Sequence, residues 1–374
     1  MSNRINQKGI RLLYAVFAWH FALLYEIDLD NEALIIMFNE GFIMSKYHIY
    51  GIGAALVDTE IEVNDNDLQS YGIEKGVMTL VDEARQSELI EQLSEHLVAS
   101  KRASGGSAAN TIIGASYFGA NTYYSCKVAD DENGEFYLND MNAAGVDTRN
   151  ETKEQGITGK CLVMITPDAE RTMNTFLGIS ETVSIAELNE EALQQSEYAY
   201  IEGYLVTSET GRAAAIALRE MAEKHQVKTA FTLSDPATVQ FFGDGLREMI
   251  GNKVNLLFCN QDEAFGFTNT ESIDDAVEAL KQYANEFVIT LGSKGALVFD
   301  GSTMINITAN AVTAIDSNGA GDMFAGAFLY AITNGYNHEQ AGNLASAASA
   351  QVVNQYGPPL QAEQHKDILT RVLA

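Results

Sequence analysis

The stretch AIDSNGAGDMFAGAFLYAITNG, residues 314–335, joins a glycine-rich turn to an apolar run with helical spacing. A helix start needs only one capping side chain, and Asp322 alone would serve as that cap. The glycines provide more than a cap requires, because Gly319 and Gly321 leave backbone N–H groups unshielded at the positive end of the helix dipole. Exposed N–H groups at this end of a helix suit an anion. The stretch therefore predicts an anion site at a helix N-terminus, with a carboxylate beside it.

The composition limits the fold class and the partners. The chain has 374 residues, 46% of them hydrophobic and 20% charged, enough for a large core in one big or two smaller α/β domains. Its 51 acidic and 23 basic residues give a formal net charge of −28, which disfavours nucleic acid and anionic membrane surfaces as partners. The 3 cysteines and 6 histidines show no metal-ligand spacing. We therefore expect no zinc site, and reduced thiols in a cytoplasmic protein.

The N-terminal segment is the exception in this composition. LLYAVFAWHFALLY, residues 12–25, is apolar behind basic residues, like a signal peptide or anchor, but it is too short to span a membrane comfortably. A strand-like run begins at Tyr47, just after Met44. We therefore expect residues 1–43 to be an extension outside a folded domain that occupies residues 44–374.

Short apolar runs alternate with amphipathic ones through most of the remaining chain. The apolar runs predict buried strands at residues 47–57, 123–129, 198–206, 228–234, 255–260 and 286–292. Apolar residues at helical spacing predict helices at residues 87–100, 208–226 and 272–285. This alternation predicts a mostly parallel sheet with helices on both faces, in which ligands gather at the carboxyl ends of the strands.

Two segments interrupt the alternation. Residues 58–70 and 157–180, with approximate bounds, alternate apolar and polar side chains without an intervening helix, as half-exposed strands do. We expect them to form a small β flap, or lid, over the edge of the sheet. A lid that excludes water is useful wherever a phosphoryl group must pass to an alcohol and not to solvent.

Phosphoryl transfer needs an anion site and a base, and the opening stretch offers both. Asp322 would accept the proton of the attacking hydroxyl while backbone N–H groups hold the anionic transition state. The residues that would supply those N–H groups are Asn318, Gly319, Ala320 and Gly321. The run Asp-Ser-Asn-Gly-Ala-Gly-Asp, residues 316–322, resembles the signature of the ribokinase/PfkB family of carbohydrate and nucleoside kinases, usually Asp-Thr-x-Gly-Ala-Gly-Asp.

A second segment of the family pattern, Gly-Gly-Ser-x-x-Asn, lies upstream as Gly105, Gly106, Ser107 and Asn110. Paired glycines let the backbone approach a ligand closely, and the serine and asparagine offer hydrogen bonds to sugar hydroxyls. From the residues alone, helix packing with Ser107 as a helix cap is an open alternative. The resemblance places this segment in a sugar site together with Asp58, whose carboxylate would accept hydrogen bonds from paired ring hydroxyls.

The lid segment adds two further candidates. Arg171 would cross to the phosphates or to the ribose, and Phe176 would stack on a base. The alternative for both is structural, as a surface arginine and a residue of the lid's own core.

The nucleotide side of the site is assigned by resemblance. Asn260 and Glu263 would orient Mg²⁺ and its waters near the phosphates, although the pair by itself also forms a helix capping box. The turn after Thr290 would border ATP, with an ordinary strand turn as the alternative. Ser346 would lie near adenine, where helix packing alone also explains a small residue. The nucleotide-side residues are Asn260, Glu263, Thr290, Gly292, Gly295 and Ser346.

The resemblance implies a three-layer ribokinase-like α/β domain with a mostly parallel central sheet and a small β lid. It also implies an ATP-dependent kinase that acts on a primary hydroxyl of a nucleoside or sugar. Gly-Gly-Ser-x-x-Asn is similar to adenosine kinases, whereas Ala54 stands where they often carry asparagine. No Lys/Arg cluster lies near Asp58 or Ser107 in the sequence, so we expect a neutral acceptor, because a sugar phosphate would need a cationic clamp.

Several alternatives for the activity stay open. An adenosine-like nucleoside is the first expectation, and a free sugar such as ribose or fructose is the second. A non-catalytic sugar- or nucleotide-binding relative is the third, although the retained Asp322 speaks against it. The resemblance also leaves open a K⁺ ion near Asp316 and a homodimer formed through the lid.

Overall fold

The computed structural model describes residues 46–96, 101–148, 154–168, 170–312, 319–354, 360 and 362–373. The chain divides into two units, residues 1–44 and 45–374, and the description below concerns the second unit. The expected extension, residues 1–43, lies outside the described residues, as do Asp316 and Asn318. In the described ranges, no helix is long and apolar enough to cross a membrane.

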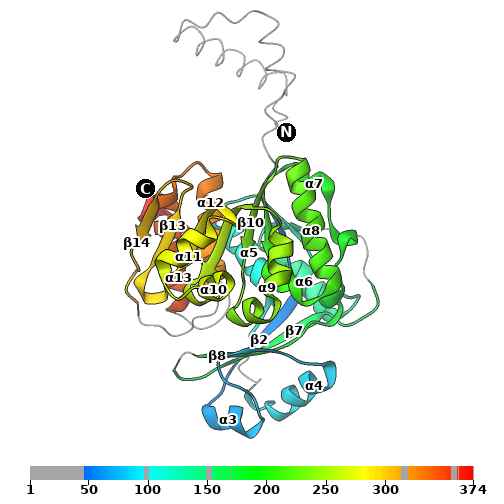
Figure 1. Ribbon diagram of the computed structural model, residues 1–374. Coiled ribbons are helices and arrows are strands. Elements are labelled where there is room, and N and C mark those ends of the chain that lie inside the picture. Colours follow the sequence, from blue (N-terminus) through cyan, green and yellow to red (C-terminus); the bar gives the residue numbers. More distant parts are fainter. Residues whose placement is uncertain are drawn as a thin grey trace, which may run out of the picture. The chain divides into compact units, whose positions relative to one another are not determined.

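A mostly parallel sheet of 9 strands forms the centre of this unit (Figure 1). The strands lie in the order β14, β13, β12, β11, β10, β9, β1, β5, β6, and β13 and β14 pair antiparallel with their neighbours. Every strand predicted from the apolar runs is confirmed with shifted bounds, and the run predicted at residues 47–57 divides between β1 and the start of a strand of the lid. The strands are β1 Tyr47–Ile52, β5 Thr122–Ser125, β6 Val146–Thr148, β9 Ser196–Glu202, β10 Lys228–Thr232, β11 Val254–Asn260, β12 Ala284–Thr290, β13 Ala296–Phe299 and β14 Met304–Ile307.

Helices cover both faces of this sheet. Side chains alternate across each strand, so Tyr200 of β9 packs into a core with α12 while Ile201 packs into the opposite core with α8. One face carries α5 Ser107–Phe118, α6 Glu132–Ala143, α12 Ala320–Thr333, α13 His338–Val353 and α14 Ala362–Leu373. The other carries α7 Glu190–Gln194, α8 Glu209–Lys224, α9 Pro236–Ile250, α10 Gln261–Thr268 and α11 Ile273–Leu280. The expected three-layer α/β architecture is confirmed.

The lid is a separate sheet of 5 strands in the order β3, β8, β7, β2, β4. Its strands are β2 Leu56–Glu62, β3 Met78–Leu80, β4 Lys101–Gly105, β7 Gly159–Ile165 and β8 Arg171–Phe176. Strands β7 and β8 pair antiparallel, as the alternation over residues 157–180 predicts. The inner face, which includes Cys161 and Met173, lies toward the central sheet, and the outer face is covered by α3 Asp65–Ser70 and α4 Glu83–Gln92 (Figure 1).

Two expectations about the lid are wrong in part. The segment 58–70 contains helix α3, because Asn64 and Asp67 form a capping box that starts a helix at Asp65. The helix expected at residues 87–100 begins earlier, at Glu83 after the cap Asp82, and packs on the lid and not on the central sheet. Helical spacing marks a buried face, but it does not say which sheet that face will cover.

Candidate active site

A cavity of about 470 Å³ lies where the carboxyl ends of the central strands face the inner side of the lid. Parallel strands that end at one edge bring Glu202, Asn260 and Thr290 to the same rim. The cavity collects most of the residues that the sequence assigns to the site. These are Asp58, Gly106, Ser107, Asn110, Arg171, Asn260, Glu263, Thr290, Gly319, Gly321 and Asp322.

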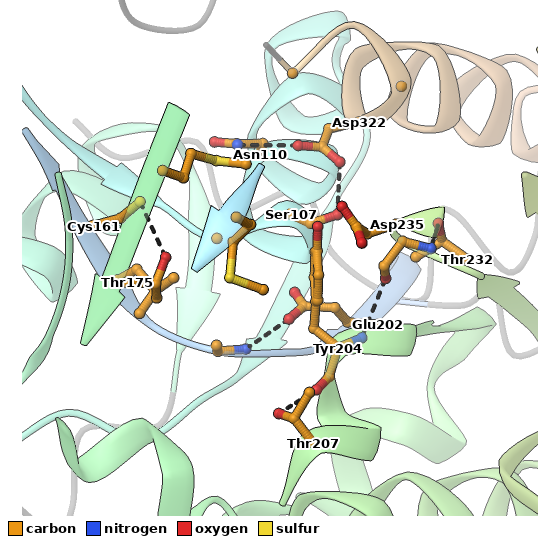
Figure 2. A pocket seen from close by; sticks show the side chains of 18 of the residues that line it. Ser107, Asn110, Cys161, Thr175, Glu202, Tyr204, Thr207, Thr232, Asp235 and Asp322 are labelled. Carbon is orange, nitrogen blue, oxygen red and sulfur yellow. Dashed lines mark hydrogen bonds between the residues drawn. The ribbon is translucent and has the colours of Figure 1, made fainter. Parts of the chain in front are cut away.

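Asp322 does not cap its own helix. Helix α12 starts after Gly319, which has a φ of 67° and no capping side chain, and Asp322 lies in its first turn. The Asp322 carboxylate instead accepts hydrogen bonds from the Ser107 hydroxyl at 2.7 Å and from the Asn110 amide at 3.1 Å (Figure 2). A Cβ added at Gly321 would meet no atom of the described residues within 4 Å, so none of these residues covers the helix start. The site therefore has a held carboxylate beside an open helix N-terminus.

The electrostatic surroundings tune Asp322 as a base. Burial raises the pKa of this carboxyl to about 6, while the bonds from Ser107 and Asn110 and the charge of Arg171 act in the opposite direction. A general base works best when its pKa lies near the operating pH. Asp322 is thus mostly ionised at neutral pH and still basic enough to take a proton.

Asp58 lines the cavity and carries a buried carboxylate oxygen. A Cβ at Gly105 would lie 2.1 Å from the Asp58 carboxyl carbon, so only glycine leaves room for this side chain. Within the described part of the chain, its Oδ1 is buried without a hydrogen-bond partner. Burial raises the Asp58 pKa to about 7, against the charge of Arg171. A buried oxygen of this kind is available to a ligand hydroxyl.

The alternative that Ser107 caps α5 is wrong, because the N-cap is Gly106 and the hydroxyl of Ser107 goes to Asp322. Arg171 is also not a surface arginine, since its side chain is 5% exposed and pairs with Glu60 at 2.6 Å on the inner face of the lid. Phe176 lies an odd number of positions from Arg171 on the same strand and is not among the cavity-lining residues. The base-stacking role expected for Phe176 is therefore not supported.

On the nucleotide side, the structure shows the expected capping box. Asn260 caps α10, and its amide donates to Glu263 at 2.6 Å. Burial and the charges of Asp235, Asp262 and Asp322 raise the pKa of Glu263 to about 7. Both residues line the cavity, so capping and a role at the nucleotide phosphates are compatible.

Thr290 lines the cavity, whereas Gly292, Gly295 and Ser346 do not. Gly292 and Gly295 both have positive φ and shape the turn between β12 and β13. The Ser346 hydroxyl donates to the Thr308 carbonyl at 3.0 Å and accepts from Asn310, and its place near adenine stays a prediction.

Sequence reasoning missed three cavity residues, Glu202, Asp235 and Tyr204. Glu202 ends β9 and accepts the Ala108 N–H at 2.8 Å, and Asp235 caps α9. The Tyr204 ring stands inside the cavity, where burial and the surrounding carboxylates raise its pKa (Figure 2). A signal was present, because Glu202 interrupts the apolar run 198–206 and Asp235 directly follows the run 228–234, and both runs predict strands of a parallel sheet.

The cavity is strongly acidic. Among its described lining residues, Arg171 is the one basic side chain. The acidic ones are Asp58, Glu170, Glu181, Glu202, Asp235, Glu263 and Asp322. In the ranges that the structure describes, no group of three or more His, Cys, Asp or Glu side chains forms a ready metal site. An anion that enters this cavity would therefore need a cation to accompany it.

Comparisons with known proteins agree with this geometry. Residues 78–364 match the profile of the pfkB family carbohydrate kinases. The adenosine kinase of Schizophyllum commune is 26% identical over 343 residues, which cover 84% of this chain and 97% of the relative. The ribokinase of Haemophilus influenzae is 28% identical over 262 residues, 68% of this chain and 82% of the relative.

Solved structures show the same likeness. The adenosine kinase from Sinorhizobium meliloti has 32% sequence identity and a TM-score of 0.80, and the match covers 86% of this chain and 99% of that one. A probable sugar kinase from Rhizobium etli has 28% identity and a TM-score of 0.81, with 88% and 99% covered. The chain therefore belongs to the PfkB family of carbohydrate kinases and is a phosphotransferase with an alcohol group as acceptor.

Proposed function

We propose that the protein transfers the γ-phosphoryl group of ATP to the primary 5′-hydroxyl of a neutral purine ribonucleoside such as adenosine. The observation that carries this proposal is the Asp322 carboxylate, which Ser107 and Asn110 hold beside the open N-terminus of α12. The adenosine kinases among the relatives and structural neighbours support the choice of nucleoside over free sugar.

Each group that lines the cavity has its own role in the proposed reaction. The buried Asp58 oxygen accepts a hydrogen bond from a ribose hydroxyl and fixes the sugar, so that the primary hydroxyl reaches Asp322. Asp322 then takes the proton of that hydroxyl as it attacks phosphorus. The backbone N–H groups at Gly319 and Gly321 face the charge that develops on the transferring group. The lid excludes water from the cavity.

The charge of the cavity supports a neutral acceptor. Arg171 is paired with Glu60, and the remaining charged lining residues are carboxylates, which would repel a phosphorylated sugar. A nucleoside brings no charge of its own into this site.

The same charge supports Mg²⁺ as the companion of ATP. The donors fit this ion, because Glu263 and Asp235 present carboxylate oxygens to the cavity and Mg²⁺ prefers oxygen ligands. Glu263 is engaged with Asn260, so the pair would hold waters of the ion. Bound Mg²⁺ would neutralise charge on the phosphates. A K⁺ ion remains an untested expectation, since Asp316 lies outside the described residues.

The proposal also covers the localisation of the protein and its oligomeric state. We place the protein in the cytoplasm, where its free cysteines Cys126, Cys161 and Cys259 would stay reduced. The edge strands β3 and β4 of the lid sheet could pair with a second chain, and light scattering would show such a homodimer.

The test compares kcat/KM for adenosine, inosine, ribose, fructose and fructose 6-phosphate at fixed Mg·ATP, with ADP release as the readout. This ratio measures discrimination in the transition state. We expect adenosine to lead. A lead by ribose or fructose would establish the free-sugar alternative, and a lead of about tenfold by fructose 6-phosphate, about 1.4 kcal/mol, would refute the neutral-acceptor argument. ATP consumption that no acceptor stimulates would refute the kinase assignment to these substrates.

A further inference from the structure

Helix α5 begins without a capping side chain of its own. Its N-cap is Gly106, with a φ of 97°, and the first turn contains no acidic residue. Ser107 could cap this helix, but its hydroxyl donates to Asp322 Oδ1 at 2.7 Å. Serine hydroxyls readily bond to the N–H groups of a nearby helix start. The Ser107 hydroxyl donates to Asp322 but caps no N–H of α5, so the helix start takes its cap from another residue.

Glu202 of strand β9 supplies the missing cap. Its side chain is buried, and its Oε2 accepts the Ala108 N–H at 2.8 Å. Ala108 is the second residue of α5, so this N–H has no partner inside the helix. A carboxylate at the N-terminal end of a helix is also favoured by the helix dipole. Glu202 thus caps the N-terminus of α5 from another element of the fold, in place of a side chain at the N-cap residue Gly106.

The surrounding backbone is shaped around this carboxylate. The Ala54 N–H reaches Glu202 Oε1 at 3.4 Å. A Cβ at Gly53 would lie 2.3 Å from Glu202 Oε2, so the turn between β1 and β2 accommodates the side chain only because this residue is glycine. A Cβ at Gly106 would lie 2.4 Å from the Ala54 carbonyl oxygen, which places the turn directly against the start of α5.

We propose that Glu202 is a positioning residue for phosphoryl transfer: by capping α5 from β9, it fixes the first turn of this helix, from which Ser107 and Asn110 hold Asp322. The inference rests on the proposed function, which makes Asp322 the base. Figure 2 shows Asp322 bonded to Ser107 and Asn110, with the Glu202 side chain below them in this view. Without Glu202, the Ala108 N–H loses its partner, the first turn of α5 is no longer fixed, and the bond from Ser107 to Asp322 weakens.

A double-mutant cycle tests this chain of contacts in the full-length protein. We expect Glu202→Ala and Ser107→Ala each to lower kcat by about 10- to 100-fold, because a misplaced base reacts slowly. The double variant should be no slower than the slower single variant, since both changes remove the same Ser107 to Asp322 bond. KM for Mg·ATP should stay within about twofold in all three.

Three further variants distinguish a positioning role of Glu202 from a general loss of stability. Glu202→Gln keeps an oxygen that can accept the Ala108 N–H, so it should retain kcat within about threefold. Glu202→Asp keeps the charge but has a shorter side chain, so this variant should reproduce the defect of Glu202→Ala. If Glu202→Ala does not fold, Glu202→Asp takes its place in the double-mutant cycle. Ser272→Ala, which removes the cap of α11, is the matched control: it should lower stability and leave kcat unchanged.

Losses that multiply in the double variant would overturn the proposal, as would a Glu202→Gln variant as slow as Glu202→Ala. A crystal structure of Glu202→Ala gives a readout that needs no turnover. In it, the first turn of α5 should be displaced, and the Ser107 hydroxyl should no longer lie within hydrogen-bond distance of Asp322. Retention of the Ser107 to Asp322 bond would refute the role of Glu202 by itself, whereas a wild-type protein inactive on every acceptor would refute the proposed function by itself.

Discussion

Replacing Asp322 by asparagine should destroy turnover and at the same time stabilise the fold. Asparagine keeps the size of the side chain and an oxygen for the Ser107 hydroxyl, but it cannot take a proton. We expect kcat to fall by ~10²–10⁴, with KM for Mg·ATP little changed. In the wild type, kcat should fall on acidification around pH 6, because burial raises the pKa of Asp322 to about 6 and only the ionised form is a base. The variant should lack this acidic limb.

The same pKa sets the expected change in stability. An aspartate whose pKa is raised from 3.8 to about 6 makes the ionised folded state unfavourable at neutral pH. About two units correspond to an upper bound of roughly 3 kcal/mol, from which the lost bond from Asn110 subtracts about 1 kcal/mol. Asp322→Asn should therefore raise the free energy of unfolding at pH 7.5 by about 1–2 kcal/mol in urea titrations. Near-normal kcat would refute the assignment of the base, and a less stable variant would refute the electrostatic reasoning.

Three further predictions follow from the same cavity and from the chain's N-terminal part. Gly105→Ala should raise the acceptor KM at least about tenfold, because the new Cβ would lie 2.1 Å from the Asp58 carboxyl carbon; an unchanged KM would remove Asp58 from the acceptor site. The ligand-free protein should become more stable as the pH falls from 7.5 to 5.5. The reason is that Asp58, Glu202 and Glu263 have folded-state pKa values of about 7 and bind protons over this range, whereas the unfolded chain does not. Urea midpoints that fall over the same range would contradict the burial of these groups. A chain that begins at Met44 should keep the thermal midpoint and specific activity of the full chain, and loss of either would show that residues 1–43 belong to the folded unit.

Features that depend on neighbouring residues could be predicted from the sequence. The strands and the helix after residue 319 follow from apolar spacing, which repeats within a few residues. The capping pair Asn260 and Glu263 and the open helix start before Asp322 are equally local, because φ angles and caps are set within one turn. The signature around Asp322 therefore indicated the family and the base before any contact was known.

The partners of these groups were decided by the tertiary structure. Ser107 and Asp322 lie 215 positions apart in the sequence, and Glu202 reaches Ala108 over 94 positions. Sequence alone favoured Ser107 as a cap, and it placed the helix after residue 87 on the wrong sheet. Local spacing says that a side chain will be buried or that a helix start needs a cap, but the strand order decides which segment meets it. The capping of α5 by a carboxylate from β9, next to the residues that hold Asp322, exists only because the fold brings those two segments together.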